Sequence, residues 1–493
     1  MKINIRRNIN TPVYKQIYHE IKERILHEEL VEGIKLPSER KLADELGVHR
    51  NTVIKAYDIL TADGLIMPSV SPRGYFVTYK AHGFSNNASI KLKPRYSNTL
   101  HYMLKDDYLI LNNLFYTLYH GDISNCNDMI SFAADISYPS DEFKSQMDKI
   151  LMDIMRDPSY NIYGTLPSQG SFDLRKSIIR ILEHKSIFVS PKEIQIISET
   201  YEAIQLIIKL FLTKDDTILV EEPISPDMFE NFQLMNINVI TIPMDQYGMQ
   251  TQYLEGLIEQ YHPKMIYTIP TFHYPTGSTM SLQRRYDLLD ISYRYDIPII
   301  EEDCDSAIRY EGNHIPTLKS LDKGGNVIYV SSFSVNVFPG IRLAYMVGPQ
   351  SVIKGAARIV ENTQMFMSPI HQFLVSKLIE DGFFYKNIKD LISLGREKRN
   401  LLCEELDNIP DVKISYDKPE GGTSLWCKIE EDLNPNMLLQ NAKKTGVTYM
   451  PGELFFPFMD SGDSHIRLCF GEINKDKIHE GVSRIAEAIR MTR

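Results

Sequence analysis

Short apolar runs alternate with longer amphipathic segments through the middle of this 493-residue chain. Each run spans only four or five residues, which suits a buried strand and is too short for a helix. Strands separated by helices usually pair in parallel, because each helix crosses back over the sheet. We therefore predict an α/β domain with a mostly parallel sheet over residues 128–493. Its strands are expected at 194–197, 217–220, 239–242, 265–268, 297–300, 327–330 and 343–347.

Both ends of the chain depart from this pattern, and the length indicates more than one domain. From about Arg399 onward, helices and strands follow one another without regular alternation, which indicates a smaller α+β subdomain. In the first 80 residues, Ser38 is placed to cap a helix over residues 39–46, which Gly47 ends. A further helix is expected over residues 50–62, and two short strands follow it around a turn at 71–74.

A largely helical segment followed by a hairpin is the layout of a winged helix-turn-helix. Arg50 and Asn51 lie in the first turn of the last helix, where such side chains can read guanine and adenine edges in the major groove. The capped start of the preceding helix suits a backbone phosphate. The alternative is that these polar residues only form a solvated helix face. The predicted DNA-binding residues are Ser38, Arg40, Arg50, Asn51, Thr52, Lys55, Arg73 and Gly74.

Charge is distributed unevenly along the chain. Residues 1–80 hold 13 Lys and Arg against 10 Asp and Glu, whereas the whole chain has a net charge of −10. A DNA-binding surface is therefore expected only near the N-terminus.

The sequence gives no sign of export or of a membrane partner. No apolar run approaches the roughly 18 residues of a membrane helix, and the N-terminus lacks the apolar core of a signal peptide. The five cysteines are scattered and show no CxxC spacing. We expect a cytoplasmic protein with reduced thiols and no metal site.

The string LPSERKLADELGVHRNTVIKAYDIL, followed by a wing that ends in RGYFV, is long and ordered. It resembles the GntR-type winged helix-turn-helix, and we assign residues 9–80 to this domain. His49 stands where the family usually has a serine helix cap. The resemblance implies binding to double-stranded DNA with repeated half-sites, one for each protomer of a homodimer.

Residues 81–127 match neither neighbouring domain. Their first part is polar and rich in Gly, Asn and Ser, which is typical of a linker. Residues 100–119 are rich in Leu and Tyr, which favours a helix that packs on the large domain or on a second subunit.

The large domain carries short motifs in a fixed order. They are Y-G-x5-G-x3-L-R from Tyr163, Y-P-T-G from Tyr274, I-E-E-D-C-D from Ile300, S-F-S-V from Ser332, P-G-I-R from Pro339, G-G before Trp426, and H-I-R-L from His465. Their order and spacing resemble fold-type-I aminotransferases, which use pyridoxal 5′-phosphate. A GntR-type head joined to such a domain resembles the MocR-type transcription regulators.

The resemblance implies a cofactor site from which this sequence departs. The family's cofactor-binding lysine follows S-x-S, and Val335 stands at that position, where it can form no covalent bond to the cofactor. The acid for the pyridine nitrogen falls on Glu302, one methylene longer than the usual aspartate. Three usual contacts, a tyrosine, an asparagine and a stacking aromatic, fall on Cys304, Tyr274 and Ser225.

Other residues of the implied site bear on the phosphate and on a substrate carboxylate. Glu199 falls on the glycine before the phosphate-binding helix, where a carboxylate would compete for the same N–H groups. Ser332 and Arg342 match phosphate contacts, Ser334 belongs to the same implied cofactor site, and Arg467 matches the carboxylate-binding arginine. These residues could equally serve structure, with Arg342 in an internal salt bridge.

We predict a sequence-specific DNA-binding transcription regulator that is not an enzyme. Its large domain is expected to sense a small-molecule effector, to dimerise, or both; the effector would bear a carboxylate if Arg467 binds it. Two alternatives stay open: an aminotransferase in which DNA binding is secondary, and a regulator that still binds pyridoxal phosphate without a covalent bond.

Overall fold

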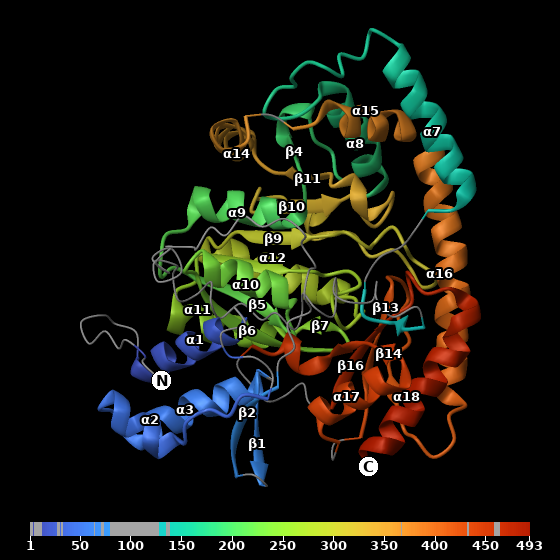
Figure 1. Cartoon of the computed structure of the whole chain (residues 1–493). Helices are drawn as coiled ribbons and strands as arrows, with labels where there is room; N and C mark the ends of the chain where they lie inside the picture. Colours follow the sequence, from blue (N-terminus) through green and yellow to red (C-terminus); the bar gives the residue numbers. More distant parts are fainter. Residues whose placement is uncertain are drawn as a thin grey trace. The chain divides into compact units, whose positions relative to one another are not determined.

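The computed structural model describes residues 3, 12–26, 30, 33–63, 65–70, 73–78, 128–134, 139–365, 367–430, 433–457 and 464–493. The chain forms two compact units, Met1–Ser97 and Asn98–Arg493 (Figure 1). The predicted linker at 81–127, including its expected helix, lies outside the described residues. The boundaries of residues 9–80 and 128–493 stay predictions.

The N-terminal unit has three helices followed by a hairpin, and the second and third helices are those predicted over residues 39–46 and 50–62. Its elements are α1 (Val13–Leu26), α2 (Glu39–Leu46), α3 (Arg50–Ala62), β1 (Ile66–Val70) and β2 (Arg73–Val77). The two strands pair antiparallel. The three helices and the hairpin share one core, in which Ile17, Leu42, Tyr57 and Ile66 are almost fully buried. This arrangement confirms the winged helix-turn-helix.

The caps of α2 and α3 fix the turn between these helices. The Ser38 hydroxyl accepts a hydrogen bond from the Lys41 N–H at 3.3 Å, and Gly47 ends α2 in the left-handed region at φ 61°. At the start of α3, the His49 ring nitrogen Nδ1 accepts a hydrogen bond from the Asn51 N–H at 3.2 Å. His49 therefore caps the helix in place of the family's serine.

An eight-stranded sheet forms the centre of the C-terminal unit, in the order β4-β11-β10-β9-β8-β5-β6-β7. The five strands from β10 to β6 pair in parallel, whereas β4, β11 and β7 join through antiparallel pairs. The predicted mostly parallel sheet is confirmed. The strands are β4 (Ile194–Ile197), β5 (Thr217–Glu222), β6 (Asn238–Asp245), β7 (Gly248–Met249), β8 (Met265–Thr268), β9 (Ile299–Glu302), β10 (Val327–Ser332) and β11 (Ala344–Val347).

The strand predicted at 297–300 starts two residues later, at Ile299. Pro298 has no N–H to donate to a neighbouring strand, so regular pairing begins after it. The strand then continues to Glu302. Two other strands, β5 and β10, also run past their apolar runs into polar residues, and β6 runs on to Asp245.

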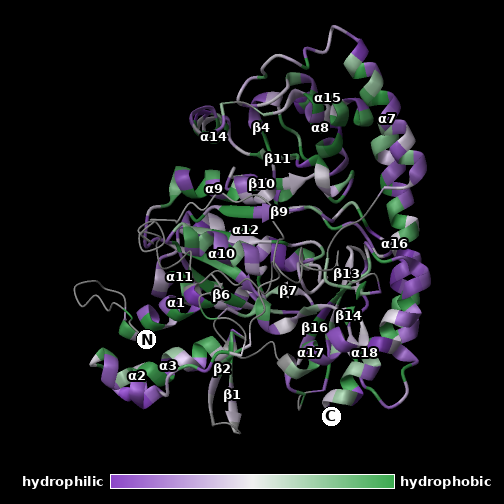
Figure 2. Cartoon of the chain, in the orientation of Figure 1, coloured by the Kyte–Doolittle hydropathy of each residue, from purple (hydrophilic) through white to green (hydrophobic). Residues whose placement is uncertain are grey.

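Helices cover both faces of this sheet. One face packs against α9 (Thr200–Phe211), α10 (Pro226–Leu234) and α14 (Gln350–Thr363). The other face packs partly against α7 (Asp141–Arg156), α8 (Phe172–His184) and α15 (Pro369–Glu380), and partly against α11 (Leu254–Tyr261) and α12 (Leu282–Tyr295). In Figure 2 the hydrophobic residues gather on the sheet and on the helix faces toward it. Shorter helical segments are α13 (Leu318–Leu321), η2 (Pro191–Glu193), η3 (Thr251–Tyr253) and η4 (Pro339–Ile341).

A smaller antiparallel sheet, β12-β13-β16-β15, builds the last part of the chain. Its core also takes in Ile130 and Phe132, from the start of the described C-terminal unit. Helix α16 (Phe383–Asp407) is continuous through Arg399, so the predicted start of the small subdomain falls within a helix. The remaining elements are β3 (Ile130–Ser131), β12 (Ser415–Tyr416), β13 (Ser424–Lys428), α17 (Pro435–Thr445), β14 (Val447–Thr448), β15 (Met450–Pro451), η5 (Gly452–Phe455), β16 (His465–Cys469), η6 (Lys475–Lys477) and α18 (Ile478–Thr492).

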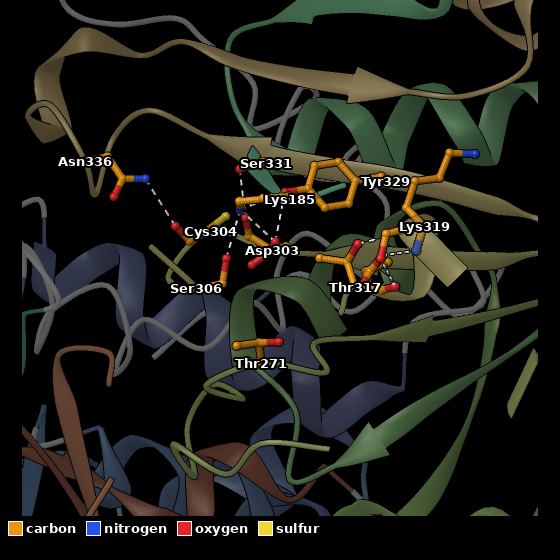
Figure 3. A network of polar contacts seen from close by, with 12 residues as sticks. Lys185, Thr271, Asp303, Cys304, Ser306, Thr317, Lys319, Tyr329, Ser331 and Asn336 are labelled. Atoms are coloured by element: carbon orange, nitrogen blue, oxygen red, sulfur yellow. Dashed lines mark hydrogen bonds and ion pairs between the residues drawn. The ribbon is translucent and has the colours of Figure 1, made fainter. Parts of the chain in front are cut away.

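A buried polar network fixes the chain directly after β9 (Figure 3). Lys185, which ends α8, donates to Asp303 and Ser306 at 2.8 Å and to Tyr329 at 3.0 Å. Burial alone would raise the pKa of Asp303. The Lys185 ammonium and the hydrogen bonds from Lys185, Ser306 and Tyr329 outweigh it and hold that pKa below its usual value. The Ser331 hydroxyl donates to the Asp303 carbonyl at 2.7 Å, so backbone and side chain are both held.

Replacing Lys185 by methionine is expected to lower the free energy of unfolding by about 3–5 kcal/mol, because it leaves Asp303 buried without its ion-pair partner. Urea unfolding followed by the fluorescence of Trp426, the only tryptophan in the chain, measures this. Adding Asp303→Asn is expected to restore much of the loss.

Lys386→Met is the matched control, because the ion pair of Lys386 with Glu142 is more than half exposed on both sides. It should cost less than about 1 kcal/mol. Equal effects of the Lys185 and Lys386 variants would contradict a structural role for the buried network.

Candidate functional site

The polar residues predicted to bind DNA lie on α2, on α3 and in the hairpin of the N-terminal unit. The side chains of Arg40, Arg50, Asn51 and Lys55 are exposed, whereas Thr52 is half-buried. Ser38 is occupied as the cap of α2. Gly74 lies in the hairpin at φ 149°, and a Cβ there would come within 2.6 Å of the Lys35 side chain. The side chain of Arg73 lies outside the described residues.

Two of these cations have partners within the unit. The Arg50 guanidinium forms an ion pair with Glu39 at 2.8 Å, and the Arg50 side chain is still 59% exposed. The Lys55 ammonium lies 4.2 Å from the centre of the Tyr14 ring, on α1. Arg50 is thus held at the start of α3 while its side chain stays accessible.

A cleft of about 470 Å³ opens in the C-terminal unit, beside the carboxyl ends of β4, β8, β9 and β10. In α/β proteins the carboxyl ends of the strands are where ligands bind. Of the residues predicted for the cofactor site, Glu199, Ser225, Tyr274, Glu302, Cys304, Ser332, Ser334, Val335 and Arg342 all line this cleft.

The Glu199 carboxylate lies among the side chains that the sequence assigned to phosphate binding. It accepts hydrogen bonds from Ser332 at 3.0 Å and from Ser334. It also accepts from the Thr200 N–H at the start of α9, at 3.3 Å, and pairs with Arg342 at 3.2 Å. Two hydroxyls, a helix N-terminus and a guanidinium therefore converge on a carboxylate of the chain itself.

Glu302 reaches the cleft from the end of β9. The Tyr267 hydroxyl donates to its carboxylate at 2.7 Å, and the Cys304 thiol lies 3.6 Å away. Burial raises the pKa of Glu302, and these hydrogen bonds and the nearby Thr200 hydroxyl lower it only in part. Burial likewise raises the pKa of the Cys304 thiol well above its usual value.

Arg467 does not line this cleft. It lies on β16 and is fully buried, and its guanidinium stacks on the Tyr274 ring, 4.4 Å from the ring centre. It also donates to the Tyr274 hydroxyl at 2.8 Å. Tyr274 thus covers the predicted carboxylate-binding arginine on the side of the cleft, and the structure does not bring Arg467 together with the phosphate-binding residues.

Sequence reasoning missed three residues that shape the cleft. Asp227, in the first turn of α10, accepts a hydrogen bond from Tyr201 of α9 at 3.2 Å. Burial raises the pKa of Asp227 to about 6. Tyr267 belongs to β8. The available signal was position, since these residues lie at or near the junction of a strand and the following helix, at the carboxyl edge of the sheet.

The described residues include no helix that is long and apolar enough to cross a membrane. No group of three or more His, Cys, Asp or Glu in the described residues could hold a metal ion. The four described cysteines, Cys304, Cys403, Cys427 and Cys469, are free thiols.

Both parts of the chain match known families. Residues 13–77 match the gntR family of bacterial regulatory proteins, and residues 133–485 match the aminotransferase class I and II family. Among solved structures, the Pyrococcus horikoshii kynurenine aminotransferase superposes with a TM-score of 0.72 at 28% identity. The match covers 80% of this chain and 98% of that one.

Proteins with both parts are also similar over nearly their full length. An uncharacterized HTH-type transcriptional regulator of Bacillus subtilis, YisV, is 27% identical over 98% of this chain and 97% of its own. The probable rhizopine catabolism regulatory protein MocR of Rhizobium meliloti is 24% identical over 98% and 94%. Aromatic-amino-acid aminotransferase 1 of Thermococcus litoralis is 30% identical over 66% and 79%. The chain therefore belongs to the MocR-type transcription regulators, in which a GntR-type helix-turn-helix precedes an aminotransferase class I and II domain.

Proposed function

We propose that this regulator binds operator DNA in a sequence-specific manner and that its aminotransferase-like domain senses an effector without catalysing transamination. The observation that carries the second part is the lining of the cleft. The described residues that line the cleft include no lysine. Val335 directly follows Ser334, at the position where the family has its lysine. A transaminase needs an amine at that point to hold the cofactor and to transfer protons.

The contacts of Glu199 argue in the same direction. A phosphate would have to displace this carboxylate from Ser332, Ser334 and Arg342, and it would meet a like charge. The residues present do not fit pyridoxal phosphate. We therefore propose no reaction step through this cofactor.

The DNA-binding part rests on the start of α3, where Arg50 and Asn51 are exposed and α2 holds Arg50 through Glu39. A homodimer in the cytoplasm reading two half-sites follows from the family, since helix-turn-helix proteins commonly bind DNA as symmetric pairs. An aminotransferase with secondary DNA binding is the other candidate, and the similarity to aminotransferases favours it.

Arg50→Ala is expected to weaken specific DNA binding by about 1–3 kcal/mol, because the side chain reads a base edge in this proposal. The operator is first recovered by selection from random duplex DNA with the full-length protein. Affinity is then measured for that sequence and for a scrambled one.

Arg358→Ala is the control, because Arg358 lies on α14 of the other unit and is 77% exposed. Unchanged affinity of Arg50→Ala for the selected sequence would mean that α3 does not read the operator through this residue.

The protein is expected to give no borohydride-stable adduct in the cleft after incubation with pyridoxal phosphate, because no lysine is among the described residues that line it. Mass spectrometry of tryptic peptides after reduction measures this. The double variant Glu199→Gly with Val335→Lys should form an adduct at residue 335, since it removes the competing carboxylate and supplies the amine.

Surface lysines of the wild-type protein give the background labelling, and the variant Arg358→Lys adds one exposed lysine on α14 as a reference. A specific adduct at any lysine near the cleft of the wild-type protein would overturn the loss of cofactor binding.

A further inference from the structure

The lining of the aminotransferase-like cleft is rich in carboxylates and aromatic rings. Four acids line it, Glu199, Asp227, Glu302 and Asp305, together with the rings of Tyr201, Tyr267, Phe272 and Tyr274. Among the described lining residues the only cation is Arg342, and its guanidinium pairs with Glu199. The lining therefore holds four acids and one guanidinium, which pairs with Glu199.

Asp227 and Glu302 differ from Glu199, because neither of them pairs with Arg342. Tyrosine hydroxyls donate to both, from Tyr201 at 3.2 Å and from Tyr267 at 2.7 Å. Neither carboxylate forms an ion pair with a Lys, Arg or His in the described part of the chain. Partly buried carboxylates without a cation are unfavourable, and a cationic ligand would offset that cost.

Tyr201 donates to the Asp227 carboxylate and lines the same cleft as Glu302. Burial raises the pKa of Tyr201 well above its usual value, and the charges of Asp227, Tyr274 and Glu302 add to that effect. Tyr201 therefore lies within electrostatic reach of both acids, on the wall of one cavity. The aromatic rings of the lining attract an organic cation through their quadrupoles, in addition to the charge of the two carboxylates.

We propose that Glu199 substitutes permanently for a bound phosphate and that the remaining cleft takes an organic cation, an amine that bears no carboxylate or phosphate. This proposal rests on the proposed function, because it names the class of effector that the domain senses. The ammonium lies against Asp227 and Glu302, and the apolar part of the ligand packs on Tyr201 and Tyr274. The volume of about 470 Å³ suits a molecule with one ring and a short side chain.

The cleft also argues against the carboxylate effector that the sequence predicts. Arg467 is fully buried behind Tyr274, and Arg342 is occupied by Glu199. An anion in the cleft would therefore meet acids and no available arginine of the described lining. The effector is thus expected to differ in charge from the substrates of an aminotransferase.

Calorimetric titration of the full-length protein with phenethylamine tests the proposal, with 3-phenylpropionate and phenylalanine as probes of the same size but different charge. We expect phenethylamine to bind and the two carboxylates to bind at least tenfold more weakly. Asp227→Asn and Glu302→Gln should each weaken phenethylamine binding about tenfold, as expected for loss of a charge-assisted contact. Asp290→Asn, on an exposed turn of α12, should leave it unchanged.

Two further measurements separate charge recognition from damage to the fold. Binding of phenethylamine should weaken as the pH falls through about 6, because Asp227 must be ionised, with Tyr201 and Glu230 as its titratable neighbours. Tyr267, Cys304 and Glu199 are the titratable neighbours of Glu302. Glu199→Gly should gain binding of inorganic phosphate, because it frees Ser332, Ser334 and Arg342 for that anion.

Stronger binding of 3-phenylpropionate than of phenethylamine would overturn the proposed charge, as would phosphate binding to the wild-type protein. The sensing function would survive that result if the bound acid changed operator affinity. If the wild-type protein bound no DNA sequence specifically, the proposed function would be overturned instead. The titrations measure ligand binding in the cleft and do not depend on DNA binding.

Discussion

The parallel pairing of the central strands is the constraint on which the rest of the C-terminal unit depends. It leaves the strand faces to be covered by helices on both sides, and it brings the ends of β8, β9 and β10 to one edge of the sheet. Polar residues can occur there without disturbing the buried faces. Glu302 and Ser332 are the last residues of their strands, and both reach the cleft for this reason.

Much of this arrangement could be predicted from the sequence, because buried strands are recognisable as short apolar runs. The strands at 194–197 and 265–268 were located in full, since each is wholly buried and mostly apolar. The prediction fell short at the polar ends of β5 and β10, which a search for apolar runs must cut off. The end of β10 is functionally important, because Ser332 lines the cleft.

The residues of the candidate site could likewise be predicted only in part. Position in a motif was enough to identify Glu199, Glu302 and Val335, because the order of the motifs fixes which strand end each residue follows. Contacts between residues distant in the sequence were not accessible from motifs. Tyr274 stacks on Arg467 although the two residues are 193 positions apart in the sequence. No local sequence pattern predicts that Tyr274 covers this arginine. No sequence pattern predicts the ion pair of Lys185 with Asp303 either.

The cluster around Glu199 has a consequence for the energetics of the whole unit. A protein that relies on a bound small molecule to satisfy a set of donors gains stability in proportion to the logarithm of that molecule's concentration. Here the acceptor is covalently part of the chain, so Ser332, Ser334 and Arg342 are satisfied in every folded molecule. The order of this loop therefore needs no bound phosphate, and its share of the stability of the folded unit does not vary with ligand concentration.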